Sequence, residues 1–172
     1  HWIKGYHYVL SALKNLQGIN LFAHYTIITQ DQPSEEILYQ IDDLSLQNYV
    51  TMACLDTQEE VYRKMRSADC LLLPSISEGI ANVVLEAMAI RLPVISSECG
   101  GMREIIEHEK YGFLFRNRDV DHLTQIMKDM INQHSDERKS ISRRARLKVE
   151  KNHNFTRLGS EMKELYHSLD LA

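Results

Sequence analysis

Two carboxylates, Glu78 and Glu86, stand in one short segment of the chain with seven residues between them. If the whole segment were helical, the two side chains would lie roughly 12 Å apart along the helix axis at 1.5 Å per residue. At that separation they do not share one proton or one metal ion. Two carboxylates placed in this way suit an elongated ligand whose hydroxyl groups are bound at two points.

A predicted helix start lies between the two carboxylates. The backbone N–H groups of residues 80–83 are at this start, where the helix dipole favours an anion. Gly79 has no Cβ to block a close approach. Glu86 stands in an otherwise apolar stretch, where a buried carboxylate without a ligand would be costly. Hydroxyl groups, an anion and further hydroxyl groups in this order describe a nucleoside diphosphate sugar, so we expect both carboxylates to border one cleft.

Strand-like and helix-like stretches alternate along the whole chain. Residues 30–33 are predicted to be a loop, and Thr57 with Glu60 has the spacing of a helix capping box. Periodicity and composition predict strands at 25–29, 49–53, 70–73 and 94–96, an apolar segment at 113–115, and helices at 8–16, 34–44, 57–66, 82–90, 102–107, 123–131, 136–151 and 156–169.

This order predicts an α/β fold with a Rossmann-like, doubly wound and mainly parallel sheet flanked by helices. The segment Cys70-Leu71-Leu72-Leu73 is apolar on both faces, as expected for a parallel strand covered by helices on both sides. Ligands of such sheets lie beyond the carboxyl ends of the strands. Glu78 follows one of those ends.

Composition excludes several other classes of protein. The 172 residues suit one domain, and the net charge of −4 lacks the basic excess that binding to nucleic acid requires. No apolar run approaches the roughly 20 residues of a membrane span. Three cysteines without metal-site spacing indicate a reducing compartment, and we expect a cytoplasmic protein. The basic residues of 138–151 are interpreted as a solvated helix face, with contact to a membrane or to another domain of the protein as the alternatives.

The segment Glu78-Gly79-Ile80-Ala81-Asn82-Val83-Val84-Leu85-Glu86 resembles the E-x7-E signature of retaining GT-B glycosyltransferases of family 4. The resemblance extends over nearly the whole chain and is densest from residue 67 to residue 115. Further matching segments stand in the expected order: Lys4-Gly5, Ser67-Ala68-Asp69, Leu73-Pro74-Ser75, Leu92-Pro93-Val94-Ile95, Gly100-Gly101, Glu104-Ile105-Ile106 and Tyr111-Gly112-Phe113-Leu114.

The resemblance implies a role for each matching residue in binding a UDP- or GDP-sugar. By similarity, Glu78 is the catalytic residue that bonds hydroxyl groups of the donor sugar, and Glu86 accepts bonds from the ribose hydroxyls. Lys4 neutralises the diphosphate leaving group. The backbone amides of Gly79, Ile80, Ala81 and Asn82 meet the sugar and the diphosphate. Neither a metal ion nor a cofactor is expected. The Gly100-Gly101 pair is either a simple turn or a phosphate-facing loop.

The resemblance also implies that residues 1–172 form the C-terminal, nucleotide-sugar-binding domain of a hexosyltransferase. Its first strand and an N-terminal acceptor domain are then expected ahead of His1, and this chain alone is expected to be inactive. Three alternatives stay open. One is another GT-B enzyme, such as a sugar-nucleotide epimerase. Another is a non-catalytic doubly wound binding or regulatory module, although Leu73-Pro74-Ser75 lacks the acidic strand end of a receiver domain. The third is a pseudoenzyme that binds the donor but does not transfer the sugar.

Overall fold

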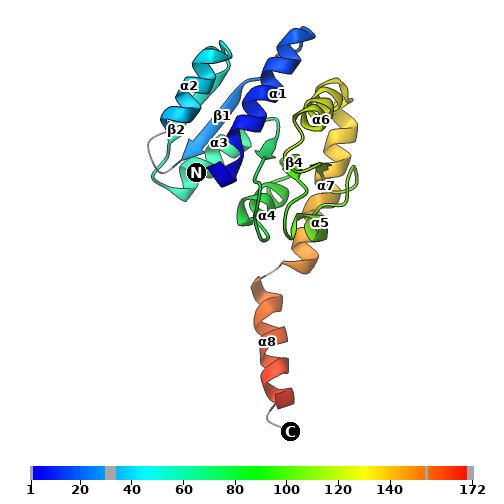
Figure 1. Ribbon diagram of the computed structural model, residues 1–172. Coiled ribbons are helices and arrows are strands. Elements are labelled where there is room, and N and C mark those ends of the chain that lie inside the picture. Colours follow the sequence, from blue (N-terminus) through cyan, green and yellow to red (C-terminus); the bar gives the residue numbers. More distant parts are fainter. Residues whose placement is uncertain (1, 30–33, 154, 170–172) are drawn as a thin grey trace.

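The computed structural model describes residues 2–29, 34–153 and 155–169, so the predicted loop 30–33 lies outside the described residues. Helices and strands alternate as expected (Figure 1). In chain order they are η1 (Trp2–Lys4), α1 (Tyr6–Gly18), β1 (Tyr25–Thr29), α2 (Glu35–Asp43), β2 (Val50–Cys54), α3 (Gln58–Arg66), β3 (Leu71–Leu73), α4 (Asn82–Ala89), β4 (Val94–Ser97), α5 (Met102–Ile105), β5 (Phe113–Phe115), α6 (Val120–Asn132), α7 (Ser135–Asn152) and α8 (Phe155–Leu169).

All strand pairs in the described residues are parallel, but they form two sheets. β1 pairs with β2 from Tyr25↔Val50 to Thr29↔Cys54. The second sheet has the order β3-β4-β5. The predicted mainly parallel α/β fold is therefore confirmed, whereas the division into two sheets was not predicted.

Two apolar clusters cover the strands. In one, the buried face of α1 packs against β1 and α6, with Leu10, Leu13 and Leu16 at most 2% exposed. Each such side chain contributes roughly 1.5 to 3 kcal/mol through burial. The other cluster joins α4, α5 and α7 around β4. These clusters fix the strands whose carboxyl ends carry the candidate site.

Three details differ from the sequence-based expectations. The helix expected at 102–107 ends at Ile105, because Ile106 is extended. Glu86 is half-buried rather than buried. Three members of the basic run on α7 do more than face solvent, since Arg138, Arg144 and Lys148 donate to backbone carbonyls of neighbouring segments. Burial lowers the pKa of Lys148.

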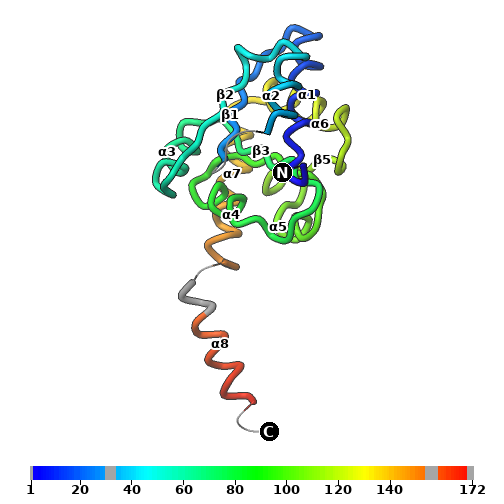
Figure 2. The backbone as a smooth tube through the Cα atoms, turned by 60° about the vertical axis from the view of Figure 1, so that its left-hand side comes forward, coloured from blue at the N-terminus to red at the C-terminus, as the bar shows by residue number. Residues whose placement is uncertain are grey.

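The helix α8 extends away from the rest of the domain (Figures 1 and 2). Its side chains Leu165, Tyr166 and Leu169 are more than half exposed. None of the helices in the described ranges is long and apolar enough to cross a membrane.

The predicted capping box at the start of α3 is confirmed. The Thr57 hydroxyl accepts a hydrogen bond from the Glu60 N–H at 3.3 Å, and the Glu60 carboxylate accepts one from the Thr57 N–H at 3.1 Å. The same carboxylate accepts from the Thr57 hydroxyl at 2.9 Å. These bonds from Thr57 lower the pKa of Glu60, because they favour the ionised carboxylate.

We expect Thr57→Ala to lower the free energy of unfolding by about 1 kcal/mol, measured by urea denaturation at neutral pH. Because the pKa of Glu60 is lower in the folded state, its contribution is complete above its unfolded pKa and is lost as pH falls through the folded value. The cost of Thr57→Ala should therefore shrink in acid. Glu60→Gln keeps the box geometry without a titrating group and should remove this pH dependence. A cost that does not vary with pH would contradict the role of the charged carboxylate.

Candidate functional site

Glu78 lies in the loop between β3 and α4, where it meets Lys4. The Lys4 Nζ donates to Glu78 Oε2 at 2.9 Å, and the Ser75 hydroxyl donates to the same oxygen at 3.4 Å. Lys4 ends η1, directly before α1, so two predicted site residues that are 74 positions apart lie in contact. The Lys4 and Glu78 side chains are 47% and 26% exposed, which leaves both accessible to a ligand.

Backbone hydrogen bonds join the chain around this ion pair. The Ile76 N–H donates to the Ile3 carbonyl at 2.8 Å. The Asn117 side-chain amide donates to the Ile76 carbonyl at 2.7 Å. The buried Ser97 hydroxyl donates to the carbonyl of Ser75, which is itself fully buried. Ser75, Ser97 and Asn117 thus position the Glu78 loop, and sequence analysis did not select any of the three for this role.

Gly100 and Gly101 lie directly behind the Glu78 loop. Gly100 has φ +50°, and a Cβ built on it would lie 1.6 Å from the Glu78 carbonyl oxygen. The Gly101 N–H donates to the Gly79 carbonyl at 3.2 Å. The sequence allowed either a simple turn or a phosphate-facing loop at Gly100-Gly101. These contacts support the turn, which lies against the backbone of the Glu78 loop. Gly5 is similar, since its φ is +68° and a Cβ there would lie 2.0 Å from the Pro74 carbonyl oxygen.

The start of α4 presents backbone rather than side chains. Its N-cap residue Ala81 makes no side-chain cap, and the Ala81 side chain is buried. A Cβ on Gly79 would meet open space, while Ile80 and Asn82 are exposed. The first N–H groups of the helix therefore remain available to an anion.

Glu86 lies one turn further along α4 and is bonded to α3. It accepts a hydrogen bond from the Gln58 side-chain amide at 3.1 Å. Gln58 is the first residue of α3 and follows the carboxyl end of β2. Sequence analysis missed Gln58, although the rule that ligands lie beyond strand ends points to this position.

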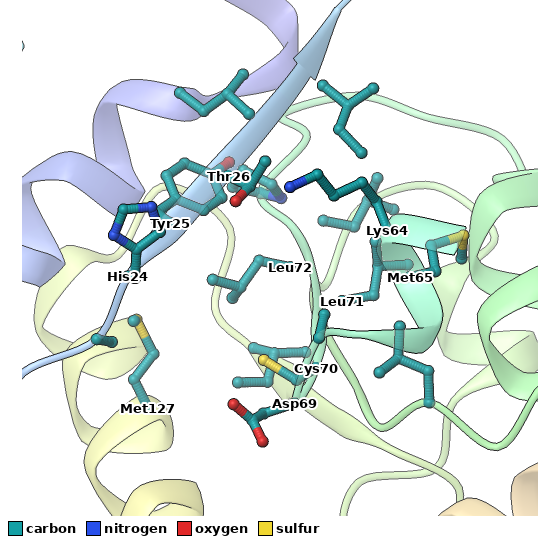
Figure 3. Close-up of a pocket in the computed structure, with 18 of the residues that line it drawn as sticks. His24, Tyr25, Thr26, Lys64, Met65, Asp69, Cys70, Leu71, Leu72 and Met127 are labelled. Carbon is teal, nitrogen blue, oxygen red and sulfur yellow. The ribbon is translucent and has the colours of Figure 1, made fainter. Parts of the chain in front are cut away.

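A cavity of about 1010 Å³ lies between β1 and β3 (Figure 3). Its lining includes residues 24–28 and 69–75, together with Lys4. Neither Glu78 nor Glu86 lines it, so it is not the cleft that was expected between the two carboxylates. That cleft stays a prediction.

Within the described ranges, no three His, Cys, Asp or Glu side chains are grouped so that they could hold a metal ion. Positive potential at the site comes instead from Lys4 and from two helix starts without side-chain caps, those of α1 and α4. The arrangement can bind an anion at the helix starts and accept hydrogen bonds from hydroxyl groups at two carboxylates.

Comparison with known proteins gives the family. Residues 1–148 match the family described as "Glycosyl transferases group 1". The chain belongs to this family. The sequence-based resemblance to glycosyltransferases with the GT-B fold is thereby confirmed at the level of the group 1 domain, and the α/β architecture agrees with one Rossmann-like half of that fold.

Individual relatives are longer than this group 1 domain. It is 29% identical over 172 residues to the putative colanic acid biosynthesis glycosyltransferase WcaL of Escherichia coli, covering 96% of this chain and 42% of WcaL. Among solved structures, a sucrose-phosphate synthase from Thermosynechococcus elongatus has a TM-score of 0.88 at 21% identity, over 99% of this chain and 43% of that one. The Anabaena protein HepE in complex with UDP has a TM-score of 0.86 at 23% identity, over 98% and 46% of the two chains.

Proposed function

We propose that this group 1 glycosyltransferase domain binds a UDP- or GDP-sugar and that the whole protein transfers the sugar to an acceptor with retention of configuration. The observation that carries the proposal is the contact between Lys4 and Glu78 beside the uncapped start of α4. At the carboxyl ends of parallel strands, this contact brings together one cation, one carboxylate that can accept hydrogen bonds from hydroxyl groups, and the first N–H donors of a helix. HepE, which shares the fold, was solved with UDP and with UDP-glucose.

Each charged residue then has one task. In the structure Lys4 and Glu78 neutralise each other at 2.9 Å. A diphosphate would compete for Lys4, and the sugar hydroxyls would donate to the released Glu78 carboxylate. Each charge-assisted bond of this kind is worth roughly 1.5 to 3 kcal/mol. As the bond between the sugar and the phosphate oxygen breaks, negative charge grows on the diphosphate, where Lys4 and the α4 amides would stabilise it.

Glu86 is the proposed acceptor of the ribose hydroxyl bonds. Its present partner, the neutral Gln58 amide, donates to one carboxylate oxygen, Oε2, at 3.1 Å, so the ribose hydroxyls can donate to the carboxylate beside it. Gln58 would then hold the carboxylate in place from the side of α3. In this arrangement the donor extends from Glu86 at the ribose to Glu78 at the sugar.

The acceptor and the catalytic step are assigned to the whole protein. This chain spans less than half of WcaL and of the solved relatives described above. We therefore propose that it binds the donor and that residues outside it bind the acceptor. We also propose a cytoplasmic location, since the three cysteines are an odd number and are far apart in the sequence.

Calorimetric titration tests the proposal. We expect UDP or GDP to bind the domain without added divalent metal, and the affinity to be unchanged by a chelator, because Lys4 and helix N–H groups supply the positive potential. The matched ligand without phosphates, uridine or guanosine, should bind at least about tenfold more weakly, as expected for the loss of one charge-assisted bond. Binding that disappears with the chelator would refute the metal-independent part. Equal affinity for nucleoside and nucleoside diphosphate would refute the anion site.

A further inference from the structure

A small hollow of about 350 Å³ lies beside the carboxyl-terminal end of α7, where α8 begins to extend from the domain (Figures 1 and 2). It is lined by Tyr111, Arg144, Leu147, Lys148, Lys151 and Asn152. Three of these six residues are cations, and none of the six is acidic. Tyr111 precedes β5, so the hollow lies toward the amino end of that strand, whereas Glu78 follows the carboxyl end of β3 in the same parallel sheet. The hollow is therefore separate from the candidate donor site.

Positive charge is concentrated on this part of the molecule. The chain as a whole has a net charge of −4, but residues 138–151 contain seven cations and one carboxylate. That carboxylate, Glu150, is paired with Arg146 at 2.6 Å. A neighbouring carboxylate in the turn before β5, Glu107, is paired with Lys110 at 2.8 Å. The electrostatic potential at the hollow is therefore positive and attracts an anion.

Arg144 is held in place by oxygen atoms that carry no charge. Its Nε donates to the Lys110 carbonyl at 2.9 Å, its Nη2 to the Glu109 carbonyl at 3.3 Å, and its Nη1 to the Ser140 hydroxyl at 2.8 Å. These bonds use three of the five N–H donors of a guanidinium group, so one N–H on each Nη remains for a ligand. A guanidinium group is well suited to phosphate, because both are rigid and their hydrogen bonds are assisted by charge.

Lys148 is half-buried between α5 and the Tyr111 ring. Its Nζ donates to the carbonyls of Glu104 and Ile105 at 2.7 and 2.9 Å, and it lies 4.8 Å from the centre of the Tyr111 ring. Two of the three ammonium N–H groups are thus used, and one remains. Burial lowers the pKa of Lys148, and this effect exceeds the opposing attraction of the Glu107 carboxylate. An additional anion would stabilise the charged form of an ammonium group in these surroundings.

Among the described residues, neither Arg144 nor Lys148 forms an ion pair with a carboxylate. Their side chains are oriented by carbonyl and hydroxyl oxygens, and their charges are not neutralised by a direct partner. Leu147 adds an apolar group to the same hollow, and its side chain is 65% exposed. Cations beside an exposed aliphatic side chain and an aromatic ring are also the groups that bind phospholipid headgroups at a membrane surface.

We propose that this hollow is a second anion site, which binds a phosphate group through Arg144, Lys148 and Lys151. The phosphate group is either free in solution or the headgroup of an anionic phospholipid. The recognising chemistry is the same in both cases, and the two experiments below separate the two sources. The proposal does not rest on the proposed function, because none of these residues belongs to the candidate donor site. It gives a role to the carboxyl-terminal part of the basic run on α7.

Amide chemical shifts recorded during a titration with inorganic phosphate test the first source. We expect saturable changes at Tyr111 and Lys148, whereas changes at residues 79–82 would report the candidate donor site, so the two sites are measured separately. Two adjacent arginines give a matched pair. Arg144→Gln should weaken binding at the hollow by about tenfold or more, through the loss of one charge-assisted bond. Arg143→Gln removes the same charge from an exposed residue that does not line the hollow, and it should change the affinity by less than about twofold.

Co-sedimentation with lipid vesicles tests the second source. We expect the chain to bind phosphatidylcholine vesicles that contain about one third phosphatidylglycerol, and to bind pure phosphatidylcholine vesicles about tenfold less. Arg144→Gln should reduce this binding and Arg143→Gln should not. Leu147→Ser should reduce vesicle binding but leave the phosphate titration unchanged, because only a lipid offers an apolar contact.

The two experiments together decide the proposal. Binding in either one that depends on Arg144 but not on Arg143 supports the site and identifies the source of the phosphate. If neither probe binds at the hollow, or if both arginine variants lose binding equally, the proposal is overturned, since an equal loss reflects only the overall charge of α7. If Arg144→Gln does not fold, Lys151→Gln at the exposed rim of the hollow takes its place in both experiments.

Discussion

Gly100→Ala is expected to lower the free energy of unfolding by about 3 kcal/mol or more, among the largest effects of a single substitution in this domain. Gly100 has φ +50°, which L side chains rarely adopt, and its added Cβ would lie 1.6 Å from the Glu78 carbonyl oxygen and 2.8 Å from the Glu78 carbonyl carbon. Both atoms belong to the backbone, so no change of rotamer relieves the clash. Either the turn leaves its conformation or the Glu78 loop moves.

Gly79→Ala is the matched control for this effect. Gly79 is the residue next to Glu78, it has no positive φ, and a Cβ there meets open space. Its free energy of unfolding should stay within about 0.5 kcal/mol of the wild type, measured by urea denaturation. If Gly100→Ala fails to fold, Gly101→Ala provides a milder test, because its Cβ contacts the exposed Ile80 side chain, which can move. Equal midpoints for Gly79→Ala and Gly100→Ala would contradict the close approach.

The turn at Gly100 and the loop that carries Glu78 also connect the stability of the domain to its proposed function. Movement of the Glu78 loop separates Glu78 from Lys4, whereas α4 with Glu86 is fixed independently by the packing of Val84, Ala87 and Met88. We therefore expect any folded variant at Gly100 to lose discrimination for the sugar part of the donor more than affinity for the nucleotide. The turn thus acts on the site through the backbone of Glu78.

Strand and helix periodicity predicted most of the fold because it is a local signal. The all-apolar strand at Leu71–Leu73, the capping box at Thr57 and the amphipathic helix α6 all follow from residues within one or two turns of each other. The division into two sheets was not predictable in the same way. It depends on which strand edges meet, and no local pattern around β1 or β3 encodes that.

The residues of the candidate site also differ in how far apart they are in sequence, and this decides which of them could be predicted. Glu78, Gly79 and Glu86 are close in sequence, so their spacing alone indicated an elongated ligand. Lys4 is 74 positions from Glu78, and only the family resemblance joined them before the structure showed the contact. Gln58 and Asn117 act through hydrogen bonds to partners 28 and 41 positions away, which periodicity does not reveal.

Glu78 is paired with a cation and Glu86 with a neutral amide. This difference gives the sharpest test of the direction in which the donor lies. Glu86→Gln should weaken the binding of UDP or GDP by roughly 5- to 150-fold, which is the loss of about 1 to 3 kcal/mol for a bond between a charged group and a hydroxyl. The reason is that the ribose, the proposed partner of Glu86, is present in every nucleotide. Glu86 accepts its hydrogen bond from the neutral Gln58 amide, so this loss is not offset by a freed positive charge.

Glu78→Gln is the matched variant, and free nucleotide should bind it as well as the wild type or better. Glu78 holds the Lys4 ammonium at 2.9 Å, so removing its charge frees that cation for the diphosphate and removes a neighbouring negative charge. Free UDP and GDP lack the sugar that Glu78 is proposed to bind, so no favourable contact is lost with them. In the full-length enzyme the same variant should lose transfer activity more than Glu86→Gln does. Calorimetry with free nucleotide on both variants decides the matter: if Glu78→Gln costs as much affinity as Glu86→Gln, the donor lies in the opposite direction from the one proposed.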